Sequence, residues 1–280
     1  MLSARLYVCL SVILAVVSAG NLAAQTDEQT ALELEGVSVT EKIGEKLPLD
    51  FVFVDDNNKT VRLAQFFTPG RPVIITFNYS DCVRFCDLQL NDMANAFKVM
   101  KLDPGTDFTV LTISVDPNET FKKAKSSKLG KLGLVGDKRY DKNWHFLTTT
   151  EEADVITFAS ALGYKYKYDA KRNVYKHKAA MMIVNGDGVV SHYVRGIGYK
   201  AEELELVLKK SAAGEMGEPS EDGSGFGLNC FVIEYTDAVA RGMTVMRIGG
   251  ALVLSFMILF LGYFWVKEFK KGPKLEEATQ

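Results

Sequence analysis

The sequence has few cysteines, few histidines and almost no excess of charge of either sign, and these scarcities restrict what the protein can be. Four cysteines in 280 residues are too few for a small domain held together by disulfides. A formal net charge of −2 lacks the basic excess of a nucleic-acid binder, so we expect no nucleic-acid partner. The hydrophobic fraction of 47% is too high for a disordered chain, and the length allows one sizeable domain with accessory segments.

An apolar segment near the amino terminus, residues 6–19, is too short to span a bilayer. Small residues follow it, among them Ser18, Ala19 and Gly20. This is the layout of a secretory signal peptide, and we expect residues 1–25 to be removed on export, together with Cys9. An uncleaved amino-terminal anchor is the alternative.

A second apolar segment, residues 248–266, carries no charge and would be about 28 Å long as a helix, enough to cross a membrane. Arg241 and Arg247 precede this segment, and a heavier cluster of four lysines follows it. The positive-inside rule then places the short tail, residues 268–280, in the cytoplasm. We therefore expect a transmembrane helix region at residues 241–267, with the middle of the chain on the other side of the membrane.

Between these two segments, residues 47–211 alternate between strand-like and helix-like patterns. The expected strands are 72–79, 108–115, 179–184 and 189–194; the expected helices are 88–100, a lysine-rich segment after Asp116-Pro117-Asn118, 154–162 and 201–209. This order predicts an α/β fold of the thioredoxin-like sandwich type, with a central mixed sheet flanked by helices. An exposed acidic lead-in, residues 26–46, is expected before the domain, and a flexible linker, residues 212–240, after it.

The candidate chemistry lies in a cysteine pair where the first buried strand meets the first long helix. Cys82 and Cys86 are separated by three residues. If Cys82 begins the helix, Cys86 lies on the same helical face, and the positive end of the helix favours both thiolates. Two such sulfurs can bind a soft metal or close a redox disulfide, and a purely structural disulfide is a third possibility.

Three histidines accompany these cysteines, and His177 is the one expected near them. It lies in the polar segment 169–178, which in a thioredoxin-like sheet passes beside the start of the first long helix. A set of two cysteines and one histidine suits Cu(I), whereas zinc needs a fourth donor. His145 is expected to be packed in the interior, and His192 to lie on the exposed face of a strand.

Several motifs together resemble the Sco/SenC family of the thioredoxin-like superfamily. They are Phe77-Asn78-Tyr79-Ser80-Asp81-Cys82 through Cys86, Ile113-Ser114-Val115-Asp116-Pro117, Trp144-His145-Phe146-Leu147-Thr148, and His177 ahead of Asn185-Gly186-Asp187-Gly188. The carboxy-terminal membrane helix resembles that of a bacterial subgroup, which implies a single-pass protein of the bacterial inner membrane with its domain in the periplasm.

The resemblance implies a copper chaperone rather than an enzyme, with Cu(I) or Cu(II) held by Cys82, Cys86 and His177. It also implies delivery of copper to the binuclear copper site of cytochrome c oxidase subunit II or a related copper protein, with an ancillary thiol-disulfide role for the cysteines. We expect Asp116 to support the site from a neighbouring loop. The chain departs from the family pattern at Val83, where many members have proline, and around Cys230.

The main alternative is a periplasmic thiol-disulfide oxidoreductase that uses the same cysteine pair. Thioredoxin-type enzymes have two residues between their cysteines and a cis-proline before a late strand. This chain has three residues there, and no proline occurs between Pro117 and Pro219. A copper or redox sensor that signals through Cys230 has no positive support in the sequence.

Two clusters of basic residues are the last feature. One is expected on the solvated face of a helix: Lys122, Lys123, Lys125, Lys128 and Lys131. The other surrounds His177: Lys165, Lys167, Lys171, Arg172, Lys176 and Lys178. A solvated surface explains such clusters without a function. Our hypothesis is that the second cluster keeps the thiolates ionised and steers an acidic partner, so that complex formation depends on salt.

Overall fold

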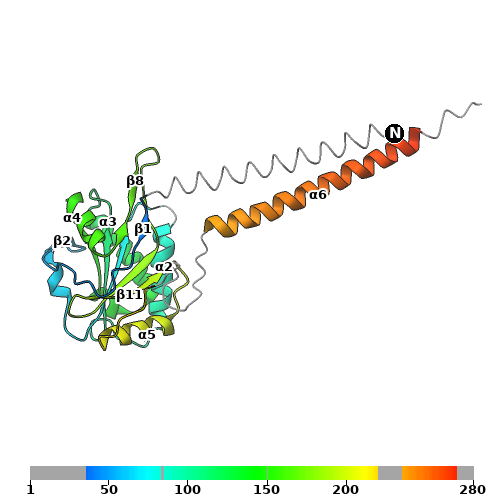
Figure 1. The fold of residues 1–280 in the computed structure, drawn as a ribbon. Helices are drawn as coiled ribbons and strands as arrows, with labels where there is room; N and C mark the ends of the chain where they lie inside the picture. Colours follow the sequence, from blue (N-terminus) through cyan, green and yellow to red (C-terminus); the bar gives the residue numbers. More distant parts are fainter. Residues whose placement is uncertain (1–35, 83–84, 150, 220–234, 270–280) are drawn as a thin grey trace, which may run out of the picture. The chain divides into compact units, whose positions relative to one another are not determined.

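The computed structural model describes residues 36–82, 85–149, 151–219 and 235–269 (Figure 1). Side chains are described for these residues except 85–86, 235–244 and 268–269. The chain divides into two compact units, Leu34–Val232 and a second unit formed by Met1–Glu33 with Ile233–Gln280. The expected signal peptide, Cys9, Cys230 and most of the expected cytoplasmic tail lie outside the described residues.

A seven-stranded mixed sheet forms the centre of the first unit, with the order β11-β10-β4-β5-β6-β2-β3. Strands β4, β5 and β6 are parallel, and every other pair is antiparallel. The strands are β2 Val52–Asp55, β3 Thr60–Arg62, β4 Val73–Asn78, β5 Thr109–Ser114, β6 Trp144–Thr148, β10 Ala180–Val184 and β11 Val190–Arg195. Every residue of β4 and β5 is buried, which explains their largely apolar sequences.

Two small antiparallel sheets lie outside the central one. In the first, β1 Ser38–Val39 pairs with β7 Tyr164–Lys165. In the second, β8 Lys167–Asp169 pairs with β9 Val174–Lys176. The segment expected as a polar loop before His177 is therefore largely a hairpin, because valine and tyrosine side chains in it pair across the two strands.

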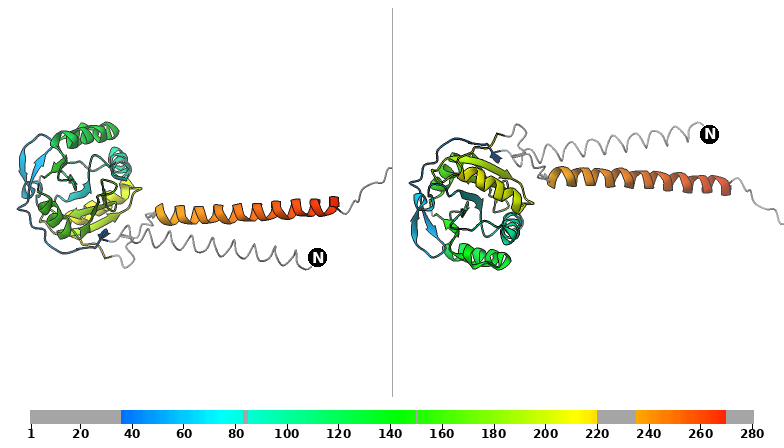
Figure 2. Two further views of the ribbon diagram at one scale, coloured as in Figure 1. Left: turned by 90° about the horizontal axis from the view of Figure 1, so that it is seen from above. Right: turned by 90° about the horizontal axis from the view of Figure 1, so that it is seen from below.

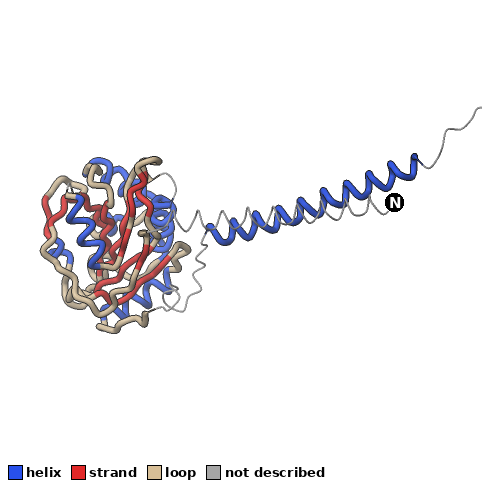
Figure 3. Tube along the Cα trace, turned by 45° about the horizontal axis from the view of Figure 1, so that its top comes forward, coloured by secondary structure: helices blue, strands red, loops and turns tan. Residues whose placement is uncertain are grey.

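Helices cover both faces of the central sheet (Figures 2 and 3). One face packs against α2 Phe85–Val99, α3 Phe121–Val135 and α5 Ala201–Ala212. The other packs against α4 Glu152–Ala161 and a 3-10 turn, η1 Leu63–Phe66. A second 3-10 turn, η2 Lys138–Asp141, precedes β6. The predicted thioredoxin-like sandwich is confirmed, and each strand and helix expected in residues 72–209 is present.

The acidic lead-in is not wholly exposed as expected. Its last part belongs to the fold, because β1 pairs with β7 and the side chains of Val37 and Val39 are buried. Glu41 also forms an ion pair of 3.0 Å with Arg195 of β11. A Val-Ser-Val alternation inside an acidic segment was the available sequence signal for this short strand. Residues 26–35 lie outside the description.

The expectation that His192 lies on an exposed strand face is wrong, since only 2% of the residue is exposed. The chain after α5 returns across β11, where the Gly217 amide donates to the Ser191 carbonyl at 2.9 Å. A side chain at position 217 would come within 2.9 Å of the His192 ring. Burial, together with the nearby charge of Lys210, lowers the pKa of His192.

Two lysines of α3 are buried rather than solvated, which corrects the expectation for that helix. Lys128 forms a buried ion pair of 3.1 Å with Asp56, and Lys131 donates to Asp87 at 2.6 Å. His145 is packed as expected, with its ring 4.6 Å from that of Phe66. Burial and the charge of Lys128 lower the pKa of His145 to about 4, so this histidine is neutral at physiological pH.

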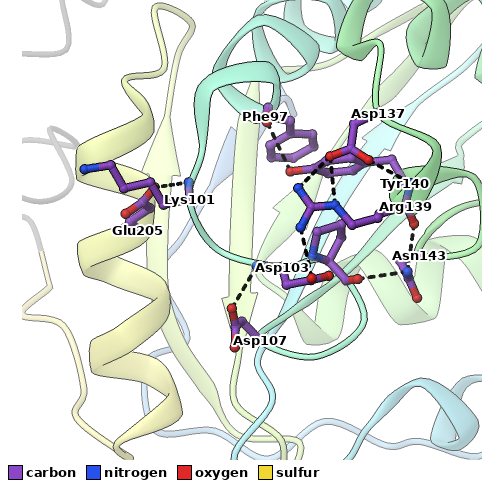
Figure 4. Close-up of polar contacts among 10 residues, drawn as sticks. Phe97, Lys101, Asp103, Asp107, Asp137, Arg139, Tyr140, Asn143 and Glu205 are labelled. Atoms are coloured by element: carbon purple, nitrogen blue, oxygen red, sulfur yellow. Dashed lines mark hydrogen bonds and ion pairs between the residues drawn. The ribbon is translucent and has the colours of Figure 1, made fainter.

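A polar cluster ties together the two connections that precede β5 and β6 (Figure 4). The Arg139 guanidinium contacts Asp137 at 2.6 Å and Asp103 at 2.9 Å. The Asn143 side-chain amide donates to the Pro104 carbonyl at 2.9 Å. These groups lie at the amino ends of the parallel strands, so the opposite, carboxyl ends are left for the cysteine segment.

The second unit contains α6, Tyr235–Phe269. Its segment Val245–Lys267 has a mean hydropathy of 2.1 and is long enough to cross a membrane. The expected apolar span at 248–266 falls inside it. The helix begins within the segment expected as linker, so the last residues of that linker are helical.

Candidate metal centre

The first cysteine lies in a short loop at the carboxyl end of β4. The Cys82 amide donates to the Tyr79 carbonyl at 3.3 Å, and its side chain is half-buried against the hydrophobic core on the α4 face. The described part of α2 begins at Phe85, so Cys82 precedes that helix instead of beginning its first turn. Cys86 occupies the first turn of α2, and its side chain is outside the description.

The register between β10 and β4 brings His177 to the same place. Met182 pairs with Ile75 and Ile183 with Ile74 in an antiparallel ladder. Continued beyond Met182 by two residues, this register sets Ala180 opposite Phe77, and three residues further it sets His177 opposite Ser80, in the loop that carries Cys82. Residues almost a hundred positions apart therefore meet because β10 and β4 are neighbours in the sheet.

Tyr79 links the two halves of the candidate site. Its carbonyl holds the Cys82 amide, and its ring lies edge-on to the His177 ring with centroids 6.2 Å apart. Its hydroxyl accepts the backbone amide of Tyr175 at 3.3 Å, and the two tyrosine rings are 5.5 Å apart. This buried side chain thus fixes the β8–β9 hairpin, and with it His177, against the loop that carries Cys82.

Tyr164 orients the imidazole. Its hydroxyl donates to the Lys178 carbonyl at 2.6 Å, so its oxygen is left to accept a hydrogen bond from Nδ1 of His177 at 2.9 Å. This arrangement favours the tautomer with a proton on Nδ1 and a lone pair on Nε2. The Tyr164 ring stacks on Phe77 of β4 at 4.7 Å, which keeps the hydroxyl in place. His177 is thereby prepared to bind a metal through Nε2.

Replacing Tyr164 with phenylalanine should weaken copper binding. The ring would still pack on Phe77, but the hydroxyl that orients His177 would be lost, and such outer partners are worth roughly 10–100-fold in metal affinity. A Cu(I) competition titration of the full chain measures the loss. Tyr166→Phe is the matched control, because the buried Tyr166 hydroxyl has no hydrogen-bond partner among the described residues. Equal affinities for the two variants would contradict the orienting role of Tyr164.

A buried carboxylate, Glu119, also holds the loop that carries Cys82 in place. It accepts hydrogen bonds from the Ser80 amide at 2.8 Å, the Ser80 hydroxyl at 2.5 Å and the Ser114 hydroxyl at 2.7 Å. Ser80 is two residues before Cys82, and Ser114 ends β5. The exposed pair Lys123–Asp81, at 2.5 Å, adds a contact to the same loop and raises the pKa of Lys123. Sequence reasoning missed Glu119, although a carboxylate just after Asp116-Pro117 was a visible signal.

Glu119→Ala should both destabilise the domain and weaken copper binding. It leaves the Ser80 and Ser114 donors without their acceptor, which costs about 1–3 kcal/mol per buried group, and it loosens the loop before Cys82. Glu119→Gln should restore most of the affinity, since an amide keeps one oxygen acceptor and can donate to the Ser80 hydroxyl. Thermal unfolding and Cu(I) titration of both variants separate the effects. A Glu119→Ala protein with unchanged affinity would refute the positioning role.

The Asp116 side chain is in contact with its own loop. Its carboxylate accepts the Asn118 amide at 2.9 Å in its own loop. Burial, and after it the charge of Asp116, raises the pKa of Tyr175 to about 12. Its supporting role stays a prediction.

Among the residues whose side chains are described, a set that leaves out Cys86, no group of three or more histidine, cysteine or acidic residues could hold a metal ion. Cys82 and His177 are brought to the same end of β4 by the contacts above. Cys86 is one turn into the adjoining helix. The arrangement supplies the Cys82 sulfur and the oriented His177 imidazole. The second sulfur belongs to Cys86, in the first turn of α2.

Comparison with known proteins decides the family. The family model described as SCO1/SenC matches residues 40–212, which is most of the first unit. The chain belongs to the SCO1/SenC family. Members of this family bind copper and are associated with cytochrome c oxidase assembly. No curated protein sequence matches the chain at a significant level.

Solved structures agree on the fold. A SCO1/SenC family lipoprotein from Bacillus anthracis is 18% identical, with a TM-score of 0.51 over 62% of this chain and 99% of that one. A candidate electron transfer protein of Aquifex aeolicus is 22% identical, with a TM-score of 0.54 over 62% and 96%. Arabidopsis thaliana ScoI with copper bound is 18% identical, with a TM-score of 0.47 over 61% and 99%. At these identities the first two similarities, with TM-scores above 0.5, show a shared fold.

Proposed function

We propose that this SCO1/SenC protein is a copper chaperone that holds copper with the Cys82 and Cys86 thiolates and the His177 imidazole. The observation that carries the proposal is the common neighbour Tyr79, which hydrogen-bonds the Cys82 loop and packs against the His177 ring. Soft thiolates select Cu(I), and an imidazole completes a three-coordinate set without a fourth donor. The client is the binuclear copper site of cytochrome c oxidase subunit II or a related copper protein.

Copper transfer then proceeds by exchange of ligands. A thiolate of the client enters the coordination sphere and displaces His177, the neutral ligand and the one furthest from the others along the chain. The two protein thiolates follow as the client supplies further ligands. Because His177 is carried by the end of a hairpin rather than by the central sheet, it can leave without disturbing the strands that hold Cys82.

The chain is tethered to a membrane by Val245–Lys267 in this proposal, with the domain in the periplasm and the tail in the cytoplasm. The lysine cluster that follows the apolar span supports this orientation. A periplasmic location would place the domain beside an oxidase whose copper site faces the same compartment.

The same two cysteines could reduce a disulfide in the client before metal arrives. Two electrons and two protons would pass to the client disulfide as Cys82 and Cys86 form a disulfide of their own. Among the described residues no peptide bond is cis, and Lys178 and Ala179 precede β10 where a thioredoxin-type enzyme has its cis-proline. These features favour copper delivery as the main activity over turnover of general disulfide substrates.

The test uses the full chain in lipid nanodiscs, loaded with Cu(I) and mixed with the soluble copper-receiving domain of an oxidase subunit II. We expect copper to appear in the receiving domain, as followed by its absorption spectrum, and no transfer from the Cys82→Ser variant. Turnover of a model disulfide is measured on the same samples. Disulfide turnover without copper binding would replace the chaperone by the oxidoreductase.

A further inference from the structure

A basic hairpin arm, defined as residues 165–178, projects from the domain next to the candidate metal centre (Figure 1). It contains β8, β9 and the turn between them, where Asn173 has a φ of +54°. The arm is a separate two-stranded sheet rather than part of the central one. His177 directly follows β9, so a partner that reaches the imidazole also comes close to the arm.

The charge of the arm is strongly one-sided. Residues 165–178 carry a net charge of +5, whereas the whole chain has −2. The one acidic residue of the arm, Asp169, is already engaged by Lys176 at 2.9 Å and Arg172 at 3.8 Å. Lys165 and Lys171 are exposed. The arm therefore has an excess of positive charge, part of which Lys165 and Lys171 present to solvent.

Aromatic packing makes the arm a firm surface. Tyr168, with 45% of its surface exposed, packs against Tyr175 at 4.9 Å between ring centroids. Tyr175 packs in turn on the buried Tyr79. The Tyr168 hydroxyl donates to the Asn173 side chain at 2.5 Å, which braces the turn. Tyrosine and arginine, both present in the arm, are residues that protein interfaces favour, whereas lysines act through longer-range attraction of an acidic partner.

We propose that the hairpin arm is a docking surface for a client protein whose copper-receiving cysteines are surrounded by acidic residues, an inference that rests on the proposed function. Charge complementarity identifies the partner: a face rich in aspartate and glutamate is attracted to the arm and is thereby brought to His177, the ligand that must be displaced. An anionic membrane surface could also attract lysines. A membrane lying on the arm would cover the imidazole and block transfer, and Tyr168 is packed on its neighbour rather than free to insert.

The experiment compares two synthetic peptides that carry the same pair of cysteines, one flanked by glutamates and the other by lysines. The full chain is held in nanodiscs of phosphatidylcholine. Association with the copper-free chain and transfer of Cu(I) from the loaded chain are both measured at low and high salt. We expect the acidic peptide to associate about tenfold faster or more at low salt, with the advantage shrinking at high salt.

A charge-reversed variant, Lys165→Glu with Lys167→Glu and Lys171→Glu, should lose this advantage. The matched control reverses three exposed lysines beside the polar cluster of Figure 4: Lys101→Glu with Lys138→Glu and Lys142→Glu. The control should keep the preference for the acidic peptide, because its charges lie at the amino ends of the parallel strands. An equal loss in both variants would show a non-specific charge effect and overturn the docking surface.

Further outcomes separate this proposal from the proposed function. Copper transferred at equal rates to both peptides would overturn the docking surface and leave the chaperone intact. A salt-sensitive preference for the acidic peptide in a chain that binds no copper would support the docking surface and overturn the copper-chaperone function. Binding to phosphatidylglycerol vesicles that disappears in the charge-reversed variant, without any preference between the peptides, would assign the arm to the membrane and overturn the proposal.

Discussion

Replacing Cys82 with serine should lower the affinity of the full chain for Cu(I) by roughly 10²–10³-fold. Four ligands supply about 10–16 kcal/mol to a structural zinc site, so one ligand is worth about 3–4 kcal/mol, and a soft thiolate on Cu(I) belongs at the upper end. Cys86→Ser should behave in the same way. His177→Ala should lose less, because an imidazole is the weaker partner of Cu(I). Competition against a chromophoric Cu(I) chelator measures all three.

The matched control for this series is Cys230→Ser, which removes a thiol from the segment between the domain and α6. Its affinity and its stoichiometry of one copper per chain should equal those of the wild type. If Cys230→Ser lost as much affinity as Cys82→Ser, the metal would be bound by a different pair of sulfurs, and the assignment of Cys82 with Cys86 would be wrong.

Replacing Asp56 with asparagine should cost the domain about 3–5 kcal/mol of unfolding free energy, since it leaves the buried Lys128 ammonium without its close, buried counter-charge. The two groups are 3.1 Å apart, and each side chain is 5% exposed. Lys128 would keep its hydrogen bond to the Asp141 carbonyl, at 2.7 Å, and a longer ion pair of 3.9 Å with the exposed Asp141 carboxylate, but it would lose its one close and buried counter-charge among the described residues. For a domain of this size the melting temperature should fall by roughly 6–20 °C. Thermal unfolding of the full chain in detergent, followed by near-ultraviolet circular dichroism, measures the shift.

A double variant distinguishes a buried charge from a simple loss of packing. Asp56→Leu with Lys128→Met removes both charges, and such apolar replacements of buried pairs are often neutral or better. It should therefore regain much of the lost stability. Glu45→Gln, which breaks the exposed pair with Lys42, should change stability by less than about 1 kcal/mol. A double variant no more stable than Asp56→Asn would contradict the explanation.

The core of the fold could be predicted from the sequence because its strands are buried on both faces. Strand β4 has a continuous apolar run and β5 a largely apolar one, and Asn185-Gly186-Asp187-Gly188 marks the hairpin between β10 and β11. The sequence analysis does not include β2, β3 or β6 among the expected strands, although β6 lies inside the central sheet between β5 and β2. Other features that escape prediction lie at the margins of the sheet. Strand β1 has two residues, and the burial of His192 depends on the chain that returns over β11 after α5. The formation of β1 and the burial of His192 both depend on tertiary contacts and not on the local sequence pattern.

The sequence suggests the ligands of the candidate site, whose assignment stays a prediction, but it does not suggest the residues that support them. Thiol and imidazole side chains are known metal ligands, which makes Cys82, Cys86 and His177 visible candidates in the sequence. The thioredoxin-like topology places the segment before β10 beside the end of β4. The roles of Tyr79, Tyr164 and Glu119 depend on which atom each one reaches. The hydrogen bond between the Tyr164 hydroxyl and Nδ1 of His177, and the one between the Glu119 carboxylate and Ser80, correspond to no sequence motif. Likewise, the burial of Lys128 depends on Asp56, which is far away in sequence.

X-ray absorption at the copper edge of the Cu(I)-loaded full chain tests the ligand set most directly. Our assignment requires two sulfur neighbours and one imidazole nitrogen around each copper, with the nitrogen signal lost in His177→Ala and a sulfur signal lost in Cys82→Ser. A wild-type spectrum with sulfur neighbours alone, unchanged by His177→Ala, would show that the hairpin histidine never reaches the metal.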